Sequence, residues 1–120
     1  HAHDFHALDS GEVPWDILFG NTGKSVVMQI DTGNCMDGGG DPIAYLKKYP
    51  GRSLTVHLKE YSATNKNAIL GEGDVQWNEL FALCETIGKT EWYIIEEEKD
   101  VYPPLVAIEM CLKNYWKMRA

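Results

Sequence analysis

The sequence predicts an α/β fold in which parallel strands are joined by helical crossovers. Three short segments, 25–31, 53–60 and 91–97, are rich in β-branched or aromatic residues and are bounded by glycine, proline or polar turns, as strands are. Apolar residues recur at helical spacing between and after these segments, so strands and helices alternate. This alternation implies a parallel sheet, either open and doubly wound or closed into a barrel.

The predicted helices carry recognisable start and stop signals. Residues 14–19 read as a short helix that ends at Gly20. Asp41-Pro42 is an N-cap followed by proline at the first helical position, and the helix that it opens stops at Pro50-Gly51. The run Gly38–Gly40 before it reads as a flexible loop, because the preceding strand ends several residues earlier.

Two further helices are predicted in the second half of the chain. Residues 77–87 have helical apolar spacing, and Gly88 is a natural C-cap. Pro103-Pro104 opens a last helix, whose apolar stripe consists of Leu105, Ile108, Leu112 and Tyr115. The first residues, His1–Phe5, read as the end of one more strand.

Composition limits the classes of function. The 120 residues suit a single domain over 1–120, and 11 basic against 18 acidic residues give a net charge of −7, the wrong sign for nucleic acid. No apolar run is long enough to span a bilayer. Cys35, Cys84 and Cys111 are too dispersed for a disulfide framework and are expected to be buried thiols, which favours the cytoplasm, although a removed export signal stays open.

The alternation of side chains along the strands brings three polar residues to one face of the sheet. Asp31, His57 and Glu96 each lie at or near the C-terminal end of a predicted strand, on the face opposite the helices. Parallel barrels build their active sites at this end. One imidazole and two carboxylates suit Mn²⁺, Mg²⁺, Co²⁺ or Zn²⁺, so we expect a divalent-metal site. His1 and His3, on one face of the expected first strand, are further candidate ligands.

Several stretches of the sequence resemble the sugar phosphate isomerase/epimerase family, whose members are xylose isomerase-like barrels. They are HAHDF at 1–5, QIDTGN at 29–34, GGGDPIAYLKKYPGR at 38–52, VHLKE at 56–60, GEGDVQW at 71–77 and EWYIIEEE at 91–98, and they run in family order. The resemblance implies a partial (β/α)8 barrel, roughly the last four βα units, strands five to eight with their helices. It also implies one metal held by residues from these four strands, which places His1 or His3 beside Asp31, His57 and Glu96.

The resemblance also implies a reaction and roles for other residues. A keto-sugar or polyol would be isomerised or epimerised by proton transfer through an enediolate, with Glu96 as the base and His3 or His1 opposite it. Substrate contacts are expected from Asn34, Lys59, Glu60 and Glu72. The sequence departs from the family in having Asn34 where an epimerase motif has histidine, and His6 where one branch often has glutamate.

Part of a barrel exposes open sheet edges and an uncovered inner face. The chain is therefore expected to form a homodimer or to pair with an N-terminal half, and to be incomplete as an enzyme. Two other classes of function remain open: a catalytically silent binding or assembly module, and a metal-dependent sugar lyase or hydrolase. A metal-dependent endonuclease is disfavoured by the acidic charge.

Overall fold

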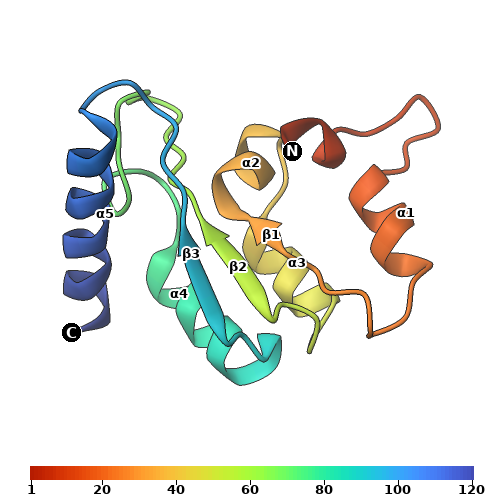
Figure 1. The fold of residues 1–120 in the computed structure, drawn as a ribbon. Coiled ribbons are helices and arrows are strands. Elements are labelled where there is room, and N and C mark those ends of the chain that lie inside the picture. The colour runs from red at the N-terminus through yellow and green to blue at the C-terminus, as the bar shows by residue number, and fades with distance from the viewer.

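The computed structural model describes residues 1–120 as three parallel strands with helices before, between and after them (Figure 1). The helix η1 is a 3-10 helix, and η2 is a π-helix that continues α4. In chain order the elements are η1 (Ala2–Phe5), α1 (Pro14–Gly20), β1 (Ile30–Asp31), α2 (Thr32–Asp37), α3 (Pro42–Lys48), β2 (Thr55–Leu58), α4 (Trp77–Leu83), η2 (Cys84–Gly88), β3 (Trp92–Ile95) and α5 (Pro104–Arg119).

The strands lie in the order β1-β2-β3, and both neighbouring pairs are parallel. In this register Asp31 is opposite His57, and His57 is opposite Ile94. Parallel neighbours need crossover connections, which the helices supply. The predicted α/β class and parallel sheet are therefore confirmed.

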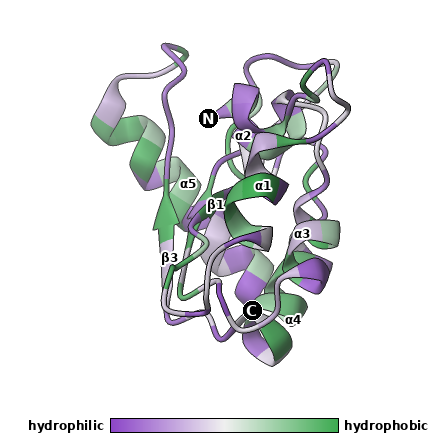
Figure 2. Cartoon of the chain, turned by 90° about the vertical axis from the view of Figure 1, so that its right-hand side faces the viewer, coloured by the Kyte–Doolittle hydropathy of each residue, from purple (hydrophilic) through white to green (hydrophobic).

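The hydrophobic core lies between the sheet and the helices α3 and α4, which are on the same side of the strands (Figure 2). The strand side chains that face this core, Ile30, Val56 and Leu58, are fully buried, and so is Met28 just before β1. The helices contribute Ile43, Leu46, Leu80 and Phe81 to the same cluster. The opposite face of the sheet is open, and on it the side chain of Trp92 is 64% exposed. The predicted alternation is thus observed in β2 and β3, whereas β1 comprises only Ile30–Asp31 of the strand expected over 25–31.

The expected strand at the amino terminus is wrong. Residues Ala2–Phe5 form the 3-10 helix η1, because Phe5 turns inward and its ring stacks on Trp15, with centroids 4.6 Å apart. The glycine loop accommodates this helix closely, since a Cβ at Gly38 would lie 2.1 Å from the carbonyl oxygen of Ala2. The sheet therefore has three strands where four were expected.

A helix that was not predicted, α2, begins directly after β1. The carboxylate of Asp31 caps it by accepting the backbone N–H of Asn34 at 2.7 Å. Helix α2 also requires glycine at Gly33, because a Cβ there would lie 2.7 Å from Cγ of Lys59 and 2.9 Å from the carbonyl oxygen of Glu60. The run Gly38–Gly40 is thus the short connection from α2 to α3 and not a long loop after the strand.

Two details of the later helices also differ from expectation. The left-handed residue after η2 is Lys89, with φ of 57°, and not Gly88. In α5 the buried side chains are Ala107 and Cys111, whereas Leu105 of the predicted stripe is 87% exposed. Met110, Tyr115 and Met118 of α5 pack against the core from the side, whereas Leu105 and Trp116 point outward. All three cysteines are buried and free, as predicted.

None of the helices combines the length and the apolar character that a bilayer crossing needs.

Candidate metal centre

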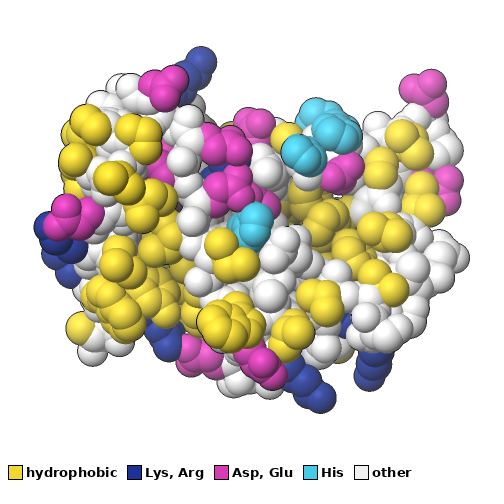
Figure 3. All heavy atoms as spheres, viewed as in Figure 1, with side chains coloured by type: hydrophobic (Ala, Val, Ile, Leu, Met, Phe, Trp, Pro, Cys, Tyr) yellow, Lys and Arg dark blue, Asp and Glu magenta, His cyan; other side chains and the backbone are white.

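The side chains of Asp31, His57 and Glu96 converge beyond the carboxyl ends of the three strands. One ligand atom from each lies within 4.8 Å of the other two. Nδ1 of His57 is 2.6 Å from Oε2 of Glu96 and 3.6 Å from Oδ2 of Asp31. Figure 3 shows acidic and histidine side chains gathered at this end of the molecule. The structure therefore brings together the three residues that the sequence singled out.

The register of the sheet explains this convergence. Asp31 and His57 are direct partners across β1 and β2, so their side chains project from the same face. Glu96 lies two residues beyond Ile94, the partner of His57, and its backbone N–H still bonds to the carbonyl oxygen of Leu58 at 3.1 Å. The side chain of Glu96 therefore projects from the same face of the sheet as Ile94, just beyond the end of β3.

The two carboxylate oxygens of Asp31 have different surroundings. Oδ1 caps α2, whereas Oδ2 is buried, faces His57 and has no hydrogen-bond partner. Burial raises the pKa of Asp31 above its ordinary value, and the negative charge of Glu96 adds to this effect, against the lowering by the bond from Asn34. A buried anionic oxygen without a partner is costly, and a cation would compensate it.

Lys59 holds Glu96 from the other side. Its Nζ is 3.1 Å from Oε1 of Glu96, 2.6 Å from Oε2 of Glu98 and 3.4 Å from Oδ1 of Asn34. Burial would raise the pKa of Glu96, but the hydrogen bond and positive charge of Lys59 outweigh it and lower that pKa below its ordinary value. The ammonium group was expected to contact substrate; in the structure it positions Glu96.

The amino-terminal histidines occupy different places. His1 lines the cavity at the metal centre, together with Gln29 and Asn34. His3 does not line it, because its side chain is 75% exposed and its Nε2 lies 3.3 Å from Asp4. The two rings stack with centroids 5.7 Å apart. His1 is thus the better placed of the two candidates.

Glu60 is neither solvated nor directed at the metal centre. Its side chain is buried, and its carboxylate accepts four hydrogen bonds from the loop that follows it. The donors are the backbone N–H groups of Tyr61, Gly71 and Val75 and the indole N–H of Trp77. Glu60 thus has a structural role in ordering residues 61–77.

The remaining predicted substrate residues also have clear positions. Asn34 lies at the edge of the metal-centre cavity, where its amide oxygen accepts from Lys59. Glu72 is exposed on the same loop, its carboxylate accepts the backbone N–H of Ile69 at 3.3 Å, and it lines neither this cavity nor the neighbouring polar one. The structure thus supports a contact for Asn34 more than for Glu72.

Two residues of this cavity escaped the sequence analysis. Gln29 immediately precedes β1, two residues before Asp31. Its side-chain amide donates to the hydroxyl of Thr55 at 2.9 Å. Glu98 lies two residues after Glu96 and pairs with Lys59. Both share the parity of a predicted ligand, so the period of two along a strand was a signal that could have found them.

The donor set fits a divalent cation. Ligand atoms on one small ion, each about 2.1 Å away, lie at most about 4.2 Å apart, so small side-chain rotations would suffice. The unpartnered Oδ2 of Asp31 supplies the anionic oxygen that such an ion needs. Asp31, His57 and Glu96 would hold the ion, with His1 at the rim of the cavity.

Comparison with solved structures identifies the fold. Two sugar phosphate isomerase/epimerase structures from Parabacteroides distasonis match the whole of this chain, one with a TM-score of 0.75 at 20% identity and the other with 0.79 at 19%. The chain spans 44% and 43% of their lengths, respectively. No protein-family model matches the sequence, and no curated protein does either.

The fold and the cluster together define an α/β protein with part of a barrel and a mixed nitrogen and oxygen site at the carboxyl ends of its strands. The resemblance inferred from the sequence is confirmed at the level of the fold, and the coverage is consistent with a C-terminal half. The chain is thus similar to sugar phosphate isomerase/epimerases over less than half of their length.

Proposed function

We propose that this chain carries the metal-binding part of a divalent-metal-dependent sugar isomerase or epimerase that acts on a keto-sugar or polyol. The observation that carries the proposal is the buried, unpartnered Oδ2 of Asp31, which faces His57 and Glu96 at the ends of parallel strands. A buried carboxylate oxygen without a hydrogen-bond partner is unfavourable, and a bound cation would compensate it. Since the chain spans less than half of the similar structures, complete turnover belongs to a larger assembly.

When bound, the divalent ion would polarise a sugar carbonyl and favour loss of the adjacent proton. The chain's own contribution is to place a carboxylate beside that proton. The lowered pKa of Glu96 keeps it ionised near neutral pH and able to accept a proton, while Lys59 fixes its orientation. His1, on the rim, is the candidate for the opposite side of the substrate.

Calorimetric titration with Mn²⁺, Co²⁺ and Zn²⁺ tests the metal site. The protein should bind close to one ion per chain, and an Asp31→Ala, His57→Ala double variant should lose that site. The matched control is an Asp9→Ala, His6→Ala double variant, since both of these residues are exposed and outside the cavity. Equal binding by all three proteins would contradict the assignment.

Proton exchange separates an enzyme from a silent binding module. Ketoses incubated with the metal-loaded protein in deuterated water should exchange the proton next to the carbonyl, and Glu96→Gln should abolish the exchange. Metal binding with no exchange, even when the remainder of a barrel is supplied, would favour the silent module. Release of water or cleavage of the sugar would favour the lyase or hydrolase alternative.

A further inference from the structure

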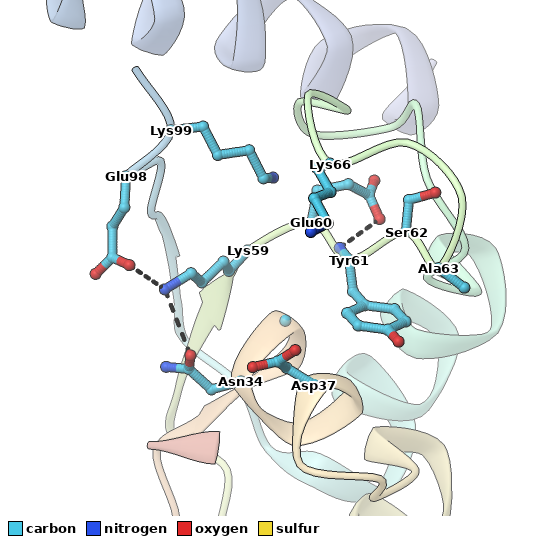
Figure 4. Close-up of a pocket in the computed structure, with 11 residues that line it drawn as sticks. Asn34, Asp37, Lys59, Glu60, Tyr61, Ser62, Ala63, Lys66, Glu98 and Lys99 are labelled. Carbon is cyan, nitrogen blue, oxygen red and sulfur yellow. Dashed lines mark hydrogen bonds and ion pairs between the residues drawn. The ribbon is translucent and has the colours of Figure 1, made fainter. Parts of the chain in front are cut away.

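A second cavity, of about 500 Å³, lies beside the metal-centre cavity, and Figure 4 shows the side chains that line it. It shares Asn34, Lys59 and Glu98 with the metal-centre cavity, so the same three side chains form the wall between them. The rest of its lining comes from α2 and from the loops after β2 and β3, namely Gly33, Asp37, Glu60, Tyr61, Ser62, Ala63, Lys66 and Lys99.

The charges of this polar cavity balance. Three of its residues are lysines and three are acids, Asp37, Glu60 and Glu98. Glu60 accepts four hydrogen bonds from the protein, and Glu98 is paired with Lys59, so neither is free. The carboxylate of Asp37 is exposed and has no hydrogen-bond or ion-pair partner in the protein, and it faces the space below Lys99 and Lys66 in Figure 4.

The free groups of the cavity comprise both acceptors and donors. Asp37 accepts only, whereas the ammonium groups of Lys66 and Lys99 donate only. Lys99 uses one proton for the carbonyl oxygen of Ala68, at 2.6 Å, and its Nζ lies 3.9 Å from Oε2 of the buried Glu97, which leaves at least one proton for a ligand. A hydroxyl group donates one hydrogen bond and accepts others, so adjacent hydroxyls satisfy both kinds of partner at once.

We propose that this cavity binds the uncharged, polyhydroxylated portion of the substrate, with hydroxyls donating to Asp37 and accepting from Lys99 and Lys66. The proposal rests on the proposed function, because the shared wall of Asn34, Lys59 and Glu98 makes the cavity an extension of the metal centre. It specifies the substrate class: a sugar or polyol without a phosphate group on the part that enters here.

The surroundings disfavour a phosphate in this cavity. The chain has two arginines, and neither lines this cavity. Arg52 donates to backbone carbonyl groups, and Arg119 forms an ion pair with Glu85. Phosphates bind well to arginine forks and to free helix N-termini, but the N-terminus of α2 is already capped by the carboxylate of Asp31. An anionic group would also meet the carboxylate of Asp37 without a net positive charge to offset the repulsion.

Amide chemical shifts of the isotope-labelled chain test this proposal with four probes: D-sorbitol, D-fructose, D-fructose 6-phosphate and inorganic phosphate. Each titration is run with and without Mg²⁺. Sorbitol and fructose should shift the amides of Asp37, Ser62, Lys66 and Lys99, and fructose 6-phosphate should bind there several-fold more weakly than fructose. Tighter binding of either phosphate probe at these amides, or no shift there with sorbitol or fructose, would overturn the proposal.

The variant Asp37→Asn removes the acceptor charge from an exposed side chain without protein partners, so the fold should be kept. Its affinity for sorbitol should fall about tenfold, the usual worth of a hydrogen bond to a charged group, while Asp9→Asn should bind as the original does. Unchanged sorbitol affinity in Asp37→Asn would count against the proposal. Polyol binding that persists when Mg²⁺ does not bind would reject the metal site and leave this cavity assigned.

Discussion

The carboxylate of Asp31 accepts the backbone N–H of Asn34 at 2.7 Å, so one side chain both caps a helix and faces the metal centre. Its second oxygen, Oδ2, is left buried without a hydrogen-bond partner. The residue thus stabilises the fold through one oxygen and destabilises the metal-free protein through the other. These two effects can be separated by substitution.

The variant Asp31→Asn should be more stable than the original protein when no metal is present. Asparagine caps helices as well as aspartate does, and its amide removes a buried charge beside Glu96. We expect a gain of about 1 kcal/mol in the free energy of unfolding at pH 7, measured with urea. Asp31→Ala removes the same charge but also the cap, so it should be about 1 kcal/mol less stable than Asp31→Asn. If Asp31→Asn is no more stable than the original protein, the claim that the buried Oδ2 destabilises the metal-free protein is contradicted.

The pH dependence of this gain has a definite sign. Because the folded pKa of Asp31 is raised, protonation favours the folded state, and the contribution is present below the unfolded value of 3.8 and lost as the pH rises through the folded value. The advantage of Asp31→Asn should therefore be large at pH 7 and shrink towards pH 3. A difference that grows on acidification would contradict this assignment.

Replacing Glu60 should disorder the loop that it holds. Glu60→Ala leaves four donors without their acceptor, three of them on the backbone, so we expect a loss of about 3 kcal/mol or more in unfolding free energy. Hydrogen exchange at Gly71 and Val75 should accelerate in the same variant. Glu72→Ala, which removes an exposed carboxylate on the same loop and a single hydrogen bond of 3.3 Å, is the matched control and should cost less than about 1 kcal/mol.

Asp16 links α1 to α3 through the hydroxyl of Tyr49 at 2.5 Å and Nζ of Lys48 at 2.7 Å. Burial would raise the pKa of Asp16, but these two hydrogen bonds lower it overall. The stabilisation should therefore be present above the unfolded value of 3.8 and be lost as the pH falls through the folded one. Asp16→Asn should cost about 1 kcal/mol at pH 6 and almost nothing near pH 2, by urea unfolding.

Lys89 adopts a left-handed backbone conformation that favours glycine. Lys89→Gly should therefore raise the free energy of unfolding by about 1 kcal/mol, because it removes the steric cost of a side chain there. Lys24→Gly, which places glycine at an exposed turn without positive φ, should be neutral or slightly destabilising. Thermal unfolding of both variants gives the comparison.

Exposed apolar side chains spread over α5 and the open edge of β3 (Figure 3). Leu105 is 87% exposed and Trp116 is 62% exposed. We expect the chain to associate through this surface, as a homodimer or with the remainder of a barrel. Sedimentation velocity should show association that Leu105→Ser, Trp116→Ser reduces, while urea stability changes by less than about 0.5 kcal/mol. A monomer at all concentrations would contradict this expectation.

Features repeated along the sequence were predictable. The alternation in 53–60 gave the buried and open faces of β2, and the same reasoning placed Asp31, His57 and Glu96 together before any distance was known. The cap at Asp41 and the prolines at Pro42 and Pro104 located two helix starts. These signals act over a few residues and depend on local geometry alone.

Features that depend on distant contacts were not predictable in the same way. Helix α2 is short and polar, so its apolar spacing is weak, and its fit depends on Gly33 lying against Lys59. The 3-10 turn of Ala2–Phe5 depends on the packing of Phe5 against Trp15. The buried role of Glu60 is set by donors that come from a loop eleven or more residues further on.

The four donors gathered by Glu60 come from both ends of the segment between β2 and α4. Because one carboxylate bonds to both ends of this segment, we expect the segment to unfold locally as a single cooperative unit. Tyr61, Ser62 and Lys66, which wall the polar cavity, belong to that unit. The backbone that carries them is therefore ordered before any ligand arrives, so a bound polyol would not incur the entropic cost of ordering that backbone.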